Sequence, residues 1–141
     1  MSSTIDITAE KSRATRIRYR VLTAVVAVVA PLAVWIVASL AGASLAITSP
    51  LVGTLQISAL LVIVSTLPLA LAAWGVLALL ERLTSNARRA WTIISVAVLV
   101  FSLPPLVFLD ATLGTKVALG CMHLAAGIVL IFMLRRRAAG A

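Results

Sequence analysis

The amino-acid sequence predicts an all-α integral membrane protein, a bundle of four transmembrane helices with its N-terminus and C-terminus in the cytoplasm. Of its 141 residues, 62% are hydrophobic and 11% are charged, whereas soluble domains carry about 25% charged residues. The apolar residues form four blocks, each close to the roughly 20 residues that cross a bilayer. Basic residues stand at the block ends that would share one side of the membrane.

The four blocks set the expected organisation of the chain. A basic cytoplasmic segment, residues 1–20, precedes a membrane domain over residues 21–137, and a short tail follows at 138–141. Signal-peptide apolar regions run to only about 7–15 residues, so the first block is expected to be a retained span. The predicted spans are about 21–41, 55–80, 90–109 and 117–134.

The placement of positive charge predicts the orientation. The N-terminal segment, the turn after the second block and the C-terminal end hold five, three and three of the twelve basic residues, and Lys116 is the remaining one. Lys and Arg accumulate on cytoplasmic segments, so these three segments are expected inside, against the anionic lipid headgroups. These positions account for the net charge of +8, so no nucleic-acid partner is predicted. The expected location is a plasma membrane, as a multi-pass protein of a bacterial inner membrane.

A polar seam is predicted where the four helices meet. On the fourth span, Gly120, His123 and Gly127 recur at spacings of three and four residues, which places them on one helix face. Serines recur on single faces of the second and third spans, and polar side chains in a membrane face the bundle interior. The predicted members of this seam are His123, Ser65, Ser102, Ser95 and Ser58.

His123 allows two interpretations. In the functional one, it is a proton-relay group, a ligand contact or a haem ligand. In the packing one, which we favour, it is a neutral imidazole that hydrogen-bonds Ser65, Ser102 or a backbone carbonyl and holds helices together. Relay chemistry needs partners that a single histidine does not have. A bis-histidine haem site needs a second histidine, and the sequence has one.

Charged residues at the span ends are expected to form interfacial ion pairs. Glu81 closes the second block beside Arg82, with Arg88 across the turn, and this arrangement predicts an ion pair that fixes the turn. A coupling carboxylate at Glu81 is the less favoured interpretation. Asp110 and Lys116 bracket the last connector and are expected to pair with each other.

No catalytic, cofactor-binding or metal-binding constellation is predicted. The single cysteine, Cys121, has no partner for a disulfide and no spacing typical of a metal site, and it is expected to be a buried small hydrophobe. Trp91 follows two arginines and is expected to be an interfacial anchor, whereas Trp35 and Trp74 are expected to pack against neighbouring helices.

Several short patterns resemble a family of small actinobacterial membrane proteins of unknown function. The patterns are Ala73-Trp74-Gly75, Leu79-Leu80-Glu81-Arg82 and Ala87-Arg88-Arg89-Ala90-Trp91, supported by Pro31-Leu32, Trp35, Ser102-Leu103 and Met122-His123-Leu124. The resemblance covers roughly residues 20–137. It implies four helices and a chain of about this length, and it transfers no catalytic or binding residue.

We consider three classes of function for a small four-helix membrane protein. The favoured one is a non-enzymatic structural or regulatory membrane component, either a homo-oligomer or a subunit of a larger complex. The alternative is a small homo-oligomeric transporter or channel that uses the polar seam around His123. A quinone-linked thiol oxidoreductase is excluded because that mechanism needs paired cysteines.

Overall fold

The structure of the chain is a computed structural model that describes residues 2–51 and 53–137. The predicted tail at 138–141 therefore lies outside the described residues. Helices account for most of the described chain, and two short strands lie between the first two long helices. The elements in chain order are α1 (Ser2–Leu40), β1 (Ala46–Ser49), β2 (Gly53–Gln56), α2 (Ala59–Leu83), α3 (Ala87–Ser102), α4 (Pro104–Val107) and α5 (Leu113–Arg137).

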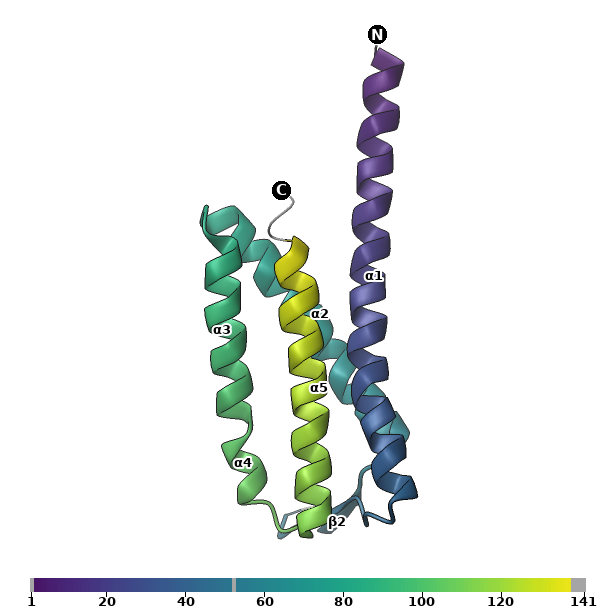
Figure 1. Cartoon of the computed structure of the whole chain (residues 1–141), viewed down its shortest axis with the longest axis vertical. Coiled ribbons are helices and arrows are strands. Elements are labelled where there is room, and N and C mark those ends of the chain that lie inside the picture. Colours follow the sequence, from purple (N-terminus) through teal and green to yellow (C-terminus); the bar gives the residue numbers. More distant parts are fainter. Residues whose placement is uncertain (1, 52, 138–141) are drawn as a thin grey trace.

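Four helical segments within the described residues are long and apolar enough to cross a membrane. They are Ile17–Leu40, Ala59–Leu83, Ala87–Val107 and Leu113–Arg135. Figure 1 shows that the N-terminal part of α1 extends beyond the bundle at the end where the α2–α3 turn and the end of α5 also lie. The β strands and the connection before α5 lie at the opposite end. The chain is thus a multi-pass membrane protein.

A β-hairpin stands where the sequence indicated only a connector. Strands β1 and β2 pair antiparallel, from Ala46 opposite Gln56 to Ser49 opposite Gly53. Gly53 has a φ of 73°, a left-handed conformation that glycine adopts without steric cost. Because these residues pair as strands, α2 begins at Ala59 and not near residue 55. The hairpin also holds the last connector, since the Thr48 N–H donates to the Asp110 carbonyl at 2.9 Å.

Prolines divide the third span. Helix α3 ends at Ser102, and the short helix α4 begins at Pro104. Proline has no N–H to donate and its ring clashes with the preceding turn, so two consecutive prolines stop the α3 hydrogen-bond ladder. Pro31 and Pro68 lie inside α1 and α2, which continue past them.

The core consists of two apolar clusters, and α5 contributes to both. One cluster joins Ala27, Ala70, Leu77, Trp91, Leu130 and Leu134. The other joins Leu45, Ile57, Val62, Ala118 and Met122. Of the four candidate spans, that of α5 has the largest buried share and that of α3 the smallest. Helix α5 is therefore the central helix, and much of the apolar surface of the others faces outward, as expected in lipid.

Close approach between α3 and α5 depends on a glycine. A Cβ atom placed on Gly127 would lie 2.7 Å from Leu99 Cδ1, whereas one on Gly120 would meet nothing within 4 Å. Small residues let membrane helices approach each other closely. Of the two glycines that flank His123 on its face, Gly127 is thus the one that permits this contact.

Candidate functional site

A cavity between α2, α3 and α5 is the candidate site. Its volume is about 710 Å³, within the roughly 300–1,000 Å³ of typical ligand sites.

 The cavity walls are mostly apolar side chains. Four of the five predicted seam residues line the cavity: Ser65, Ser95, Ser102 and His123. The structure therefore brings most of the predicted seam around one space.

The three serines that line the cavity form hydrogen bonds within their own helices. Each hydroxyl donates to a backbone carbonyl three or four residues earlier, so none of these bonds joins two helices. The donor and acceptor pairs are Ser65 Oγ to Val62 O at 3.1 Å, Ser95 Oγ to Trp91 O at 2.6 Å and Ser102 Oγ to Leu99 O at 2.7 Å. This pattern is common for serine in membrane helices, where no water is present to accept the proton.

His123 follows the same pattern. Its Nδ1 lies 2.9 Å from the Leu119 carbonyl oxygen, one turn earlier in α5. A carbonyl oxygen only accepts, so Nδ1 carries the proton of this bond, and Nε2 of a neutral imidazole is left as an acceptor. The side chain is half-buried and lines the cavity. It can therefore contact an occupant of the cavity, while its described hydrogen bond holds it to its own helix.

Ser58 does not line the cavity. It is the N-cap of α2, and its Oγ accepts from the Leu61 N–H at 3.2 Å. The first N–H groups of a helix have no partner within the helix, and a serine at this position satisfies one of them. Capping of α2 therefore explains why a serine stands at position 58, without a role in the cavity.

The indole N–H of Trp91 has no hydrogen-bond partner among the described residues. Trp91 is 3% exposed and packs in the apolar core, so its expected position as an interfacial anchor is wrong. The ring also lines the cavity. Tryptophan normally pairs its N–H when buried, as Trp35 does by donating to the Ile57 carbonyl at 2.7 Å. Trp91 is therefore the one unsatisfied buried side-chain donor in the described part of the chain.

The charged residues at the span ends are not joined in ion pairs within 4.0 Å in the described structure. Lys116 Nζ donates to the carbonyl of Val107, the last residue of α4, at 2.8 Å instead of to Asp110. Glu81, Arg82 and Arg88 are all exposed. Solvated charges of this kind gain little from pairing, which accounts for the open arrangement of the predicted pairs.

A cluster of hydroxyl groups that was not predicted from the sequence joins the segment between α1 and β1 to the start of α5, at the hairpin end. Thr115 is fully buried, and its Oγ1 lies 3.1 Å from Ser44 Oγ and 3.0 Å from Thr112 Oγ1. Thr112 also accepts from the Thr115 N–H, which makes it the N-cap of α5. Two threonines three residues apart, Thr112 and Thr115, shortly before the fourth apolar block were the available sequence signal.

Among the described residues, no group of three or more His, Cys, Asp or Glu side chains could hold a metal ion. Cys121 is exposed on the surface of α5, so its expected burial is wrong. The outward position suits its helix face, since Met122 beside it is buried in the core. A small, weakly polar thiol is readily accommodated against lipid.

These features define a multi-pass membrane protein whose cavity walls carry few polar groups. The chain belongs to a family of unknown function (DUF6069), whose model matches residues 11–140. Neither the curated proteins nor the solved structures include a significant match to the chain.

Replacing Thr115 is expected to cost more stability than replacing His123. Thr115→Val removes a buried hydroxyl that bonds to Ser44 and Thr112. We expect the free energy of unfolding to fall by about 1 kcal/mol. His123→Leu keeps the volume and removes only a bond within one helix, so its effect should stay below about 0.5 kcal/mol. Equilibrium unfolding in mixed detergent micelles measures both values. A larger loss for His123→Leu would show that the imidazole holds helices together.

Proposed function

We propose that the protein is a non-enzymatic structural or regulatory component of a bacterial plasma membrane, and that it acts as a homo-oligomer or as a subunit of a larger membrane complex. The hydrogen bonding of the seam is the observation that carries this proposal. His123 and the serines of the cavity are bound to backbone carbonyls of their own helices. Groups bonded in this way form no chain of donors and acceptors between helices, and such a chain is what proton transfer would need.

The proposed orientation places both termini in the cytoplasm, with an actinobacterial origin suggested by the sequence patterns alone. Support comes from the distribution of charge: the basic segments before residue 21, in the α2–α3 turn and at the end of α5 hold eleven of the twelve basic residues. These three segments lie at the same end of the bundle (Figure 1). One end of the molecule is thus suited to anionic headgroups and to the cytoplasmic side.

A small transporter is the second candidate function, and the cavity favours it. A space of about 710 Å³ with a half-buried imidazole in its wall could hold a small apolar substrate. In that case coupling to protons would fall to His123 or Glu81. Proton-linked transport that persisted in both His123→Ala and Glu81→Gln would exclude this version of the mechanism.

The function is tested by what accompanies the protein when it is purified gently from its native membrane. We expect either a second membrane protein in fixed ratio or a defined number of copies of this chain, identified by mass spectrometry. A lone oligomer that carries a bound small molecule other than a membrane lipid would favour transport and contradict the proposal. Absorbance typical of haem would contradict the expectation that no cofactor is bound.

Cysteine labelling tests the orientation. In a Cys121→Ser background, a cysteine at Leu51, which is 95% exposed in the hairpin turn, should react with a membrane-impermeant maleimide added to intact cells. A cysteine at Ser85, exposed in the α2–α3 turn, should react only after the cells are opened. The reverse pattern would place the termini outside.

A further inference from the structure

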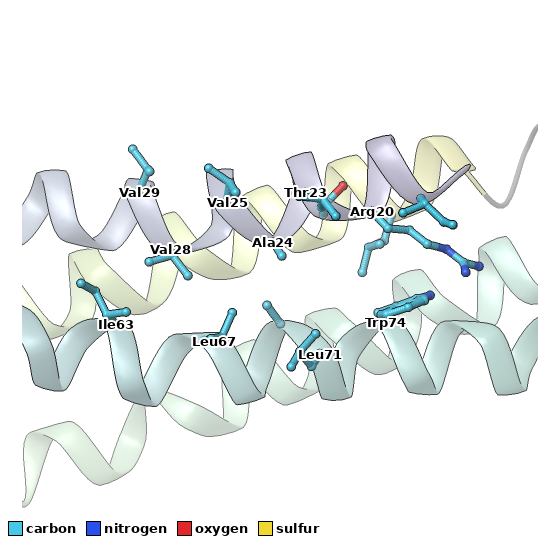
Figure 2. Close-up of a pocket in the computed structure, with 14 residues that line it drawn as sticks. Arg20, Thr23, Ala24, Val25, Val28, Val29, Ile63, Leu67, Leu71 and Trp74 are labelled. Atoms are coloured by element: carbon cyan, nitrogen blue, oxygen red, sulfur yellow. The ribbon is translucent and has the colours of Figure 1, made fainter. Parts of the chain in front are cut away.

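A second hollow, which we call the α1–α2 groove, lies on the side of the bundle between those two helices. Its volume is about 410 Å³. The walls are almost entirely aliphatic. In Figure 2, Val28 of α1 and Ile63 and Leu67 of α2 lie between the two helices, whereas Val25 and Val29 point away from α2. Representative wall residues are Val25, Val28 and Val29 from α1 and Ile63, Leu67 and Leu71 from α2.

One end of the groove carries a positive charge in a fixed position. The Arg20 guanidinium carbon lies 4.6 Å from the centroid of the Trp74 ring, and Figure 2 shows both residues at the same end of the groove. A guanidinium held over an aromatic ring keeps N–H groups free for a phosphate or carboxylate. In the described structure, no carboxylate pairs with Arg20 within 4.0 Å. The charge is therefore available to an anion from outside the chain.

The depth of the groove matches one leaflet of a bilayer. Arg20 and Val29 are nine residues apart on α1, and Trp74 and Ile63 are eleven apart on α2. At a rise of 1.5 Å per residue, these separations are about 14 and 17 Å, and half of the hydrocarbon core is about 15 Å. The Tyr19 hydroxyl, next to Arg20, donates to the Met133 carbonyl at 3.1 Å. Arg20 therefore lies level with the basic end of α5, where headgroups are expected.

We propose that the α1–α2 groove binds an anionic phospholipid, with the phosphate on Arg20 and one acyl chain along the aliphatic walls. An aliphatic groove of leaflet depth suits an acyl chain, and an unpaired guanidinium at its headgroup end suits an anion. A second copy of the chain is the competing occupant, and loss of a dimer in the groove variants described below would reveal it. The site goes beyond the proposed function and does not depend on which end of the bundle is cytoplasmic.

Native mass spectrometry of the purified protein, titrated with palmitoyl-oleoyl-phosphatidylglycerol in a non-ionic detergent, tests the charged end of the site. Arg20→Gln should weaken binding of the first lipid by about fivefold, the effect of roughly one interfacial charge. Arg18→Gln is the matched control, since Arg18 is exposed and lies outside the groove. Binding of palmitoyl-oleoyl-phosphatidylcholine should change less in Arg20→Gln. Equal effects of the two arginine variants would overturn the proposal.

A second pair of variants tests the acyl-chain part of the site. Leu67→Trp adds bulk in the groove at a position that is 44% exposed, so the variant should fold. It should weaken binding of the first phosphatidylglycerol molecule, whereas Val64→Trp, on the same helix but outside the groove, should not. Equal lipid binding by these two variants would contradict the proposal. A dimer that Leu67→Trp abolishes would assign the groove to a second copy and would also overturn it.

Discussion

Hydrocarbon offers no hydrogen-bond partners, and this constraint accounts for the arrangement of the serines and of His123 in the spans. Backbone N–H and C=O groups are satisfied within helices, and the hydroxyl groups of the serines turn back to carbonyls of the same helices. His123 does the same through Nδ1. The helices can therefore meet through apolar and small side chains, and their association does not rely on buried charges.

Packing is organised around α5 as a result. It contacts the other long helices through its small and apolar residues, and Gly127 lets Leu99 of α3 approach closely. Beyond the spans, water and headgroups are available, and interactions between elements become polar. Thr115, Ser44 and Thr112 bond to one another at the hairpin end. Arg20 and Trp74 stack at the other end. The bundle is thus apolar along its length and polar at its two ends.

Long apolar blocks and the charges that flank them made the four spans predictable, because length and hydropathy alone decide which helices can cross a bilayer. Four of the polar residues that the helical periodicity of the sequence singled out lie in the walls of the cavity. The hairpin was missed because each of its strands is only four residues long. Leu45, with a φ of 47°, marks a tight bend there that only tertiary packing reveals. Ser58 was misassigned because a helix cap and a buried seam position both suit serine.

The tautomer of His123 is the most direct test of this account, because the chain has one histidine and its ring signals need no assignment. Nitrogen-15 NMR of the protein in lipid nanodiscs, after purification through a tag without histidine, distinguishes the two ring nitrogens. A proton on Nδ1 is the expected result, since that nitrogen donates to the Leu119 carbonyl. A neutral ring protonated only on Nε2 would show that this bond is absent, and it would contradict the claim that the seam is satisfied within its own helices.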